Sequence, residues 1–335
     1  MLTLPPRLRP GDTIAVFSPS SPTTVFAPTR FQRAKEFLQA KGFRILEGSL
    51  TGKADHYRSG SVQDRVAELN ALIHNPEVKA IMSTIGGYNS NSMLPYIDYA
   101  HLKAHPKIVT GYSDMTAILQ AIQAQANLVT YYGPALVASF GELPPLVDET
   151  YNMFEELLVE LPALPYTLPT PTAWTDEWLD WEKQDRPKIT QPNQLITVMP
   201  GKAEGKLVGG NLNTMSGFFG SKYMPPIEEG DILLLEDCLS NAQVIERSFA
   251  MLKLQGVLDR VGGIILGKHE KYDDQGTGRK PHEILMEILN GREMPFLAEF
   301  DIAHTHPMVP VPLGIRVSLD ADKQKVSLLE AWTKG

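Results

Sequence analysis

The stretch KIVTGYSDMTAILQAI, residues 107–122, passes from a short apolar run through a tight turn into an amphipathic helical pattern. Gly111 stands where such a turn is crowded, and Ser113 comes just before the helix. This arrangement lifts a serine oxygen clear of a sheet edge and places it near the positive end of a helix dipole. Ser113 is therefore a candidate nucleophile. An ordinary helix cap is the other interpretation, because the full G-x-S-x-G pattern is absent.

The same alternation of strand and helix extends on both sides of this turn. Short β-branched runs alternate with amphipathic stretches from about residue 12 to residue 134. This pattern is typical of a parallel sheet wrapped by helices, so we expect a doubly wound, flavodoxin- or Rossmann-like α/β domain. The expected strands are 13–17, 43–46, 80–84, 107–110 and 128–131, and the expected helices are 27–41, 62–74 and 114–125.

The pattern changes after residue 142. Residues 142–200 are rich in proline and predict one helix followed by a long connecting segment. Further on we expect strands at 232–235, 263–266, 315–319 and 325–329, and helices at 242–254 and from 281. The sequence thus predicts an amino-terminal α/β domain over 1–160, a linker with a tryptophan-rich substrate loop over 161–200, and a carboxyl-terminal β-rich α/β domain over 201–335.

Composition narrows the class of protein. A chain of 335 residues is longer than one hydrophobic core usually spans, which favours two domains. The formal net charge is −8 with acids and bases interspersed, so we expect no binding to nucleic acid polymers. The single cysteine, Cys238, excludes an internal disulfide framework and fits a reducing compartment. No signal peptide or membrane span is indicated, so we expect a cytoplasmic protein without membrane contact.

Two other turns carry candidate groups. Gly86 and Gly87 follow the apolar run KAIMSTI, where paired glycines let a backbone approach a ligand and offer an N–H to an oxyanion. An ordinary loop or a phosphate loop are the alternatives, although the lysine of a phosphate loop is missing. Glu236 ends the run DILLLED, and an acid held at a strand end can orient a catalytic imidazole. Asp237 beside it is the rival.

Candidate bases lie in two segments. His304 and His306 belong to FDIAHTHPMVPVPLG, a proline-rich loop, and rigid loops often carry catalytic histidines. The H-x-H spacing could instead serve a metal, but no cluster of further ligands accompanies it in the sequence. His269 in LGKHEKYDD is another candidate base, and nothing local separates it from His304. Cys238 is assigned to packing, because the neighbouring acids would raise the pKa of its thiol.

The run AWTDEWLDWE contains Trp174, Trp178 and Trp181. A helix over this run would place the three rings along one face, which usually indicates core or domain contact. Beside a cleft, the same rings could stack on an aromatic group or nucleobase of a ligand.

Together these segments resemble the LD-carboxypeptidase family of serine peptidases, and within it the branch of microcin C self-immunity proteins. The resemblance covers nearly the whole chain in matching order. It is carried by LRPGDTIAVFSPSSP, STIGGYNSNSMLPYIDY, GYSDMTAI with YYGP, WTDEWLDWE, LVGGNLNT, LLLEDC and AHTHPMVPVPLG.

The resemblance implies roles for individual residues. Ser113 would be the nucleophile, His304 the general base and Glu236 the acid that orients it, with N–H groups of Gly87 and Asp114 as the oxyanion hole. No metal or organic cofactor is implied, and a homodimer is. Residues expected to bind substrate are Gly86, Asn89, Ser90, Trp178, Trp181, Lys268 and His269.

Two positions depart from the family pattern. Family members commonly have glycine before the histidine and aspartate two residues after it, whereas this chain has Ala303 and His306. An imidazole in place of an acid could alter the pKa of the base or the contacts with substrate.

The expected reaction is hydrolysis of an amide. The branch implies a small peptide or peptidyl-nucleotide substrate, cleaved between an aminoacyl group and a nucleotide-like moiety as in microcin C. Release of terminal D-alanine from a murein tetrapeptide is the alternative. A binder without catalysis on the same scaffold is a third interpretation, which the intact Ser113, Glu236 and His304 disfavour.

Overall fold

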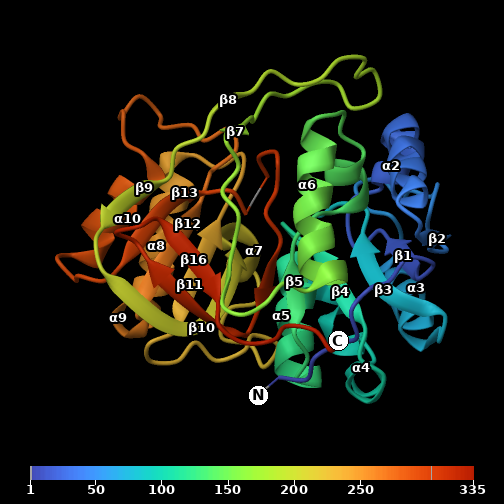
Figure 1. Ribbon diagram of the computed structural model, residues 1–335, viewed down its shortest axis with the longest axis horizontal. Coiled ribbons are helices and arrows are strands. Elements are labelled where there is room, and N and C mark those ends of the chain that lie inside the picture. The colour runs from blue at the N-terminus through green and yellow to red at the C-terminus, as the bar shows by residue number, and fades with distance from the viewer. Residues whose placement is uncertain (1, 303) are drawn as a thin grey trace.

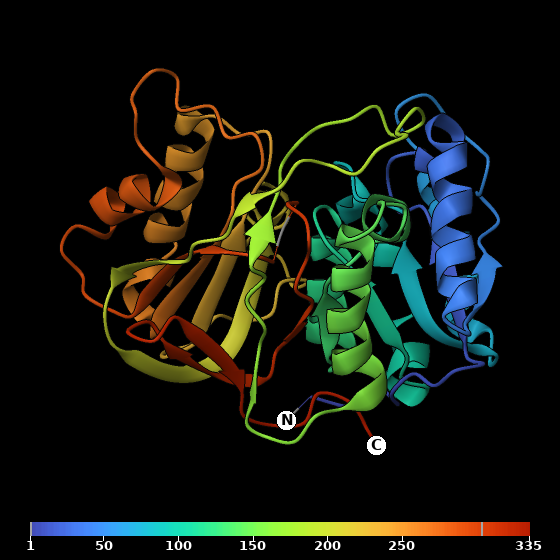
Figure 2. The ribbon, with the colours of Figure 1, turned by 45° about the horizontal axis from the view of Figure 1, so that its top comes forward.

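Two β-sheets with flanking helices lie side by side in the computed structural model (Figure 1). The structure describes residues 2–302 and 304–335, so Ala303 lies outside the described residues. Figure 2 shows the blue-to-green amino-terminal half beside the yellow-to-red half. Among the described residues, no helix is both long and apolar enough to cross a membrane.

The first sheet has six strands in the order β14-β5-β4-β3-β1-β2. Strands β1 to β5 run parallel, and β14 pairs antiparallel with β5. The succession 2-1-3-4-5 is that of a flavodoxin-like doubly wound sheet, so the predicted α/β fold class is confirmed. The strands are β1 (Thr13–Phe17), β2 (Arg44–Glu47), β3 (Val78–Ser83), β4 (Ile108–Gly111), β5 (Thr130–Tyr132) and β14 (Val311–Leu313).

Helices cover both faces of this sheet, which is why its inner strands are buried along their whole length. Helix α3 begins with a capping box between Ser61 and Asp64. The helices here are α1 (Thr23–Phe26), α2 (Pro28–Ala40), α3 (Val62–His74), α4 (Tyr99–Ala104), α5 (Met115–Ala126) and α6 (Leu146–Glu155), with short helical turns η1 (Ser90–Tyr96), η2 (Leu136–Phe140) and η3 (Glu156–Glu160).

The second sheet has eight strands in the order β6-β16-β15-β10-β11-β12-β13-β9, and its centre from β10 to β13 is parallel. Its strands are β6 (Tyr166–Thr167), β9 (Ile196–Met199), β10 (Lys202–Asn211), β11 (Ile232–Glu236), β12 (Gly263–Gly267), β13 (Phe296–Phe300), β15 (Arg316–Asp320) and β16 (Lys325–Leu328). Its helices are α7 (Leu212–Ser216), α8 (Ala242–Leu254), α9 (Val257–Arg260) and α10 (Pro281–Leu289), and a separate hairpin pairs β7 (Ala173–Trp174) with β8 (Gln191–Pro192).

The chain crosses between the two halves more than once. Strands β6 and β9, from the segment predicted to be a linker, join the second sheet, and β14 returns to the first. Between β7 and β8 the chain reaches over to α2, where the Thr29 N–H donates to the Glu182 carboxylate (Figure 2). The division of the chain at residues 160 and 200 stays a prediction.

The crossing from β13 to β14 carries His304 and is tied down at its start. The Lys268 Nζ lies 2.6 Å from Oδ1 of the buried Asp301, and the Asn193 amide donates to Oδ2 at 2.7 Å. The Asp301 carbonyl accepts the Val309 N–H at 2.7 Å, which closes the loop at its base. Lys268 therefore anchors the segment from beneath.

Replacement of this anchor should be costly. Lys268→Met leaves the buried Asp301 carboxylate without its cation, which should lower the free energy of unfolding at neutral pH by about 3–5 kcal/mol. Burial already raises the pKa of Asp301, and loss of Lys268 raises it further. Because the folded state then takes up a proton more readily than the unfolded chain, the loss should shrink as the pH falls. Urea denaturation at several pH values measures both effects.

The double variant Lys268→Met/Asp301→Asn is the control. It removes the buried charge together with its partner, so most of the stability should return. A double variant as unstable as Lys268→Met would contradict the assignment.

Candidate active site

Ser113 occupies the sharp turn between β4 and α5. Its φ of 61° lies in the left-handed region, which residues other than glycine rarely adopt. Contacts on both sides of the peptide hold this conformation. The Ser113 N–H donates to Tyr132 Oη at 3.0 Å, and the Ser113 carbonyl accepts from the N–H and hydroxyl of Thr116. Strain maintained in this way is frequent where a side chain must be presented to a ligand.

The loop after β3 packs directly against this turn. A Cβ atom on Gly86 would lie 2.9 Å from Ser113 Oγ and 3.0 Å from the Asp114 nitrogen, so a larger residue there would collide with the serine. Gly87 has a φ of 144°, and a Cβ on it would collide with Ser20. Among the described residues, no acceptor takes the N–H of Gly87 or Asp114. Both N–H groups are thus free to bind an oxyanion.

Asn89 and Ser90 hold the turn from behind. Their backbone N–H groups donate to Oδ2 of the buried Asp114 at 3.0 and 2.9 Å, and the Ser90 hydroxyl donates to the Asp114 carbonyl at 2.6 Å. Arg65 in turn donates to Asn89 Oδ1 at 2.7 Å. These contacts fix the backbone that presents Ser113.

Glu236 is fully buried at the end of β11 and bonds His304. Its Oε2 lies 2.8 Å from His304 Nδ1, whereas Oε1 accepts the Asn211 amide at 2.9 Å and the Tyr132 hydroxyl. Burial alone would raise the pKa of Glu236, but His304 and these hydrogen bonds outweigh it and lower the pKa. Because Tyr132 also accepts the Ser113 N–H, one chain of hydrogen bonds links Ser113, Tyr132, Glu236 and His304.

The His304 ring presents its other nitrogen away from this carboxylate. Burial would lower the pKa of His304, but the opposing effects of Cys238 and Glu236 raise it well above 6.5. Burial also raises the pKa of the Cys238 thiol, so this thiol is neutral near pH 7. We therefore assign the raised pKa of His304 to the negative charge of Glu236. The Tyr112 ring packs edge-on against the imidazole at 4.8 Å between centroids. Nδ1 is thus engaged and Nε2 is the nitrogen available for proton transfer.

The two rivals have other partners. The Asp237 carboxylate accepts the Cys238 N–H at 2.9 Å, and burial with the nearby Glu236 charge raises the pKa of Asp237 to about 6. The His269 Nδ1 lies 3.0 Å from the Gly267 carbonyl oxygen, and burial lowers the pKa of His269 to about 4. The geometry therefore pairs Glu236 with His304.

A cavity of about 460 Å³ opens above this network, a size typical of small-molecule sites. Both halves of the chain line it, and Ser113 and His304 are both part of its lining. Gly86, Gly87, Trp178 and Trp181 also line it. Of the other expected substrate contacts, Asn89, Ser90, Lys268 and His269 are not among the described residues that line the cavity.

Aromatic rings surround the mouth of the cavity. Phe26, Tyr88 and Trp178 all line it with side chains 55%, 79% and 58% exposed. Residues 173–182 form a short strand and turns instead of a helix, so the three tryptophans do not share a helical face. Trp178 donates to Glu270 at 3.1 Å, and Trp181 packs under the Arg30 guanidinium at 4.7 Å. Trp174 instead lies 5.3 Å from Lys268 Nζ.

Sequence reasoning missed a buried charged cluster beside the cavity. Arg30 and Lys188 lie 3.0 and 3.2 Å from the Glu142 carboxylate. His306 adjoins them, and burial together with the Lys188 charge lowers the pKa of His306 well below 6.5, so its ring is neutral. Lys188, Glu270 and His306 line the cavity. Only His306 carried a signal, as a departure from the family pattern, because the other members are scattered along the chain.

Comparison with known proteins identifies the family. The LD-carboxypeptidase N-terminal domain matches residues 14–133, and the LD-carboxypeptidase C-terminal domain matches residues 204–319. A Vibrio cholerae protein named as a carboxypeptidase is 55% identical over 325 residues, 97% of each chain. The microcin C7 self-immunity protein MccF of Escherichia coli is 50% identical over 96% of this chain and 94% of its own. The murein tetrapeptide carboxypeptidase of Pseudomonas aeruginosa is 26% identical over 90% and 92%.

Solved structures give the same result. MccF in complex with aspartyl sulfamoyl adenosine matches with a TM-score of 0.97 and 49% identity, over 99% of this chain and 100% of that one. MccF in complex with glutamyl sulfamoyl guanosine matches with the same TM-score over 99% of both chains. With both domains of the family matched and relatives alike over almost their whole length, the chain belongs to the LD-carboxypeptidase family of serine peptidases.

Proposed function

We propose that the protein hydrolyses an amide bond with Ser113 as nucleophile, His304 as general base and Glu236 as the acid that orients the base. The observation that carries this proposal is the 2.8 Å contact between His304 Nδ1 and Glu236 in a network that also fixes Ser113. Ser113 and His304 face one cavity, as the nucleophile and base of an acyl transfer must.

The reaction proceeds in two halves. Ser113 Oγ attacks the amide carbonyl while His304 Nε2 takes the hydroxyl proton, and the imidazolium then gives that proton to the leaving amine. Water next attacks the acyl-enzyme, His304 takes its proton, and Ser113 recovers a proton as the acid product leaves. Glu236 keeps Nδ1 as the protonated nitrogen throughout and stabilises the imidazolium.

The oxyanion is stabilised by two backbone donors. The N–H groups of Gly87 and Asp114 come from two loops that press together at Gly86. The buried Asp114 carboxylate, held by Asn89 and Ser90, fixes the second donor in place before substrate arrives. Donors set in advance need no reorganisation in the transition state, which is why such groups contribute strongly to rate.

The substrate we propose is an aminoacyl or peptidyl group joined through an amide to a nucleotide-like moiety, as in microcin C and its processed forms. The aromatic mouth of Phe26, Tyr88 and Trp178 favours a flat nucleobase. MccF, known with aminoacyl sulfamoyl nucleotides bound, is half identical to this chain. This activity would detoxify such compounds.

Murein tetrapeptide hydrolysis is the second candidate. It rests on the relative in Pseudomonas aeruginosa, whose identity is about half that of MccF. A murein tetrapeptide has no flat ring to stack on Phe26, Tyr88 or Trp178, whereas a nucleotide has its base. The aromatic mouth therefore favours the nucleotide substrate. The homodimer and the cytoplasmic location expected from the sequence stay predictions.

Ser113 can be tested with two variants. Ser113→Ala and Ser113→Gly should both lower kcat/KM by about 10⁴-fold or more, because each removes the nucleophile. Glycine also relieves the left-handed strain that alanine retains, so Ser113→Gly should be more stable than Ser113→Ala by about 1 kcal/mol. Turnover assays and urea denaturation of the purified variants give both readouts. Near-normal turnover by either folded variant would refute the role of Ser113.

The pH dependence tests the pairing of Glu236 with His304. Because the pKa of His304 is raised above 6.5 and the base must be neutral, kcat/KM should fall with decreasing pH along a limb centred above 6.5. Glu236→Gln removes the charge that raises this pKa, so the limb should move to lower pH while the maximal rate drops by about 10²–10⁴-fold.

Glu246→Gln, an exposed change of the same kind on α8, is the matched control and should leave the profile in place. If the limb of Glu236→Gln coincides with that of the unmodified protein, another residue than His304 controls it.

Substrate choice can be tested directly with two compounds. The purified protein should turn over aspartyl sulfamoyl adenosine with a higher kcat/KM than a murein tetrapeptide. Trp178→Leu or Trp181→Leu should raise KM for the nucleotide substrate by about tenfold, the loss of one base–aromatic stack. Trp174→Leu changes a tryptophan of the same run outside the described cavity lining and serves as control. Faster turnover of the murein peptide would assign the protein to murein recycling instead.

A further inference from the structure

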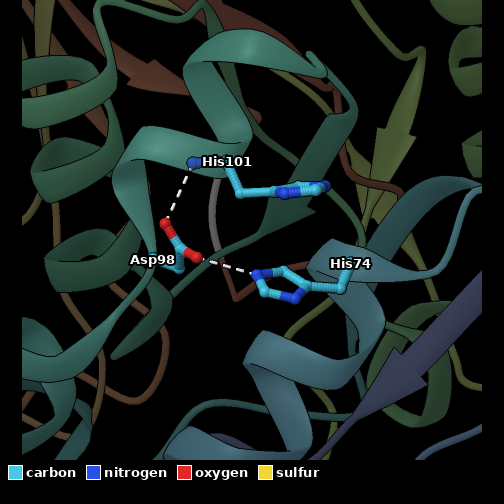
Figure 3. Close-up of side chains that lie close together, drawn as sticks. All are labelled: His74, Asp98 and His101. Carbon is cyan, nitrogen blue, oxygen red and sulfur yellow. Dashed lines mark hydrogen bonds and ion pairs between the residues drawn. The ribbon is translucent and has the colours of Figure 1, made fainter.

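A cluster of imidazole and carboxylate groups lies on the first half of the molecule, away from the cavity. His74 is the last residue of α3, Asp98 caps the start of α4, and His101 lies one turn into α4 (Figure 3). One ligand atom from each lies within 4.8 Å of the others. His74 and His101 stack with ring centroids 4.2 Å apart, and the Asp98 carboxylate lies alongside.

Neighbouring groups fix the carboxylate in this position. Asn70, one turn before His74 on α3, accepts the Asp98 N–H at 2.9 Å and donates to the Tyr96 carbonyl at 3.0 Å. Oδ1 of Asp98 accepts the His101 N–H at 2.9 Å, which caps α4. Oδ2 lies 2.7 Å from His74 Nε2. Helix capping therefore accounts for one carboxylate oxygen, and the second faces the imidazole cluster.

A further imidazole lies beside the cluster. The His101 ring centroid lies 4.2 Å from that of His74 and 4.5 Å from that of His105. Imidazole nitrogen and carboxylate oxygen are ligand atoms that metal ions take in proteins.

We infer that His74, Asp98 and His101 bind one divalent transition-metal ion of the zinc class, with solvent completing the coordination. Two imidazole nitrogens and one carboxylate oxygen are ligands that zinc accepts, whereas magnesium and calcium prefer oxygen alone. Zinc bonds of about 2.0–2.2 Å place ligand atoms closer than 4.8 Å apart, so binding would require the side chains to rotate and the two facing rings to part until both imidazole nitrogens point at the ion.

The position of the cluster predicts its effect. His74 ends α3, and Asp98 caps the start of the short helix α4. After α3 the chain enters the amino end of β3, and after α4 it enters the amino end of β4, the parallel neighbour of β3. Ser113 follows the opposite, carboxyl end of β4. A metal here would tie α3 to α4 and stabilise the fold without entering the chemistry, so this inference does not depend on the proposed function.

The experiment uses the untagged full chain after treatment with a chelator. Zinc chloride is titrated against a chromogenic zinc indicator for affinity, and thermal unfolding is followed with and without zinc. We expect binding at this site and a melting temperature that rises with zinc concentration, because an ion that binds only the folded state stabilises it. Magnesium chloride at the same concentrations should produce no such rise.

His74→Gln, His101→Gln and Asp98→Asn should each weaken zinc binding by at least about tenfold and abolish the thermal shift. Asp98→Asn keeps an oxygen acceptor for the helix cap, so its zinc-free melting temperature reports whether the fold is intact. His56→Gln removes an exposed histidine outside the cluster and should behave like the unmodified protein. Absence of binding, or equal binding by all variants, overturns the inference.

Discussion

The buried carboxylate of Glu236 is the group on which the rest of the site depends. An ionised carboxylate without contact to water is strongly unfavourable unless donors surround it. Its donors come from separate parts of the fold: Asn211 at the end of β10, Tyr132 on β5 and His304 on the crossing from β13 to β14. Because Tyr132 belongs to the first sheet and Glu236 to the second, compensation of this one charge requires the two sheets to meet in a single arrangement. The same requirement brings His304 and Ser113 to one cavity.

Parallel sheet topology explains why the remaining groups converge. The loop with Gly86 and Gly87 follows β3, Ser113 follows β4, and Glu236 ends β11, so each stands at the carboxyl end of a parallel strand. Ligand sites of open α/β sheets form at such ends, where the loops of adjacent strands meet. The close approach of Gly86 to Ser113 leaves no room for a side chain, and the left-handed Ser113 turns its hydroxyl toward that gap. Local strain and the absence of one Cβ atom together shape the space beside the serine.

The sequence predicted well those helices whose stability depends on residues close together in the chain. Helices α3 and α8 match the predicted 62–74 and 242–254, because the spacing of their apolar residues and their caps are written in adjacent positions. Strand β10 escaped prediction, because the glycines and charges of KAEGKLVGGN mask a strand that only its partners β11 and β15 stabilise. For residues of the site, the sequence can indicate that a segment lies near a cleft, but it does not show in which direction a side chain points. Lys268 was expected at the substrate, yet its ammonium turns beneath the His304 segment to Asp301. Arg30, Glu142 and Lys188 are distant in sequence, so no motif could join them.

His306, which departs from the family pattern, lies beside the cluster of Arg30, Glu142 and Lys188, and this position explains its effect on charge. Arg30 and Lys188 set two cations against the single carboxylate of Glu142, and the imidazole of His306 adds no charge because its pKa is far below 6.5. An aspartate there would add a second negative charge beside the two cations. The neutral ring adds none, and Lys188 instead interacts with a second carboxylate, Glu270, which lines the same cavity. In a region of low dielectric constant, these charges act strongly on one another. The imidazole at position 306 therefore leaves the balance of charge beside the cavity to Arg30, Lys188, Glu142 and Glu270, and it does so without altering the Glu236–His304 pair.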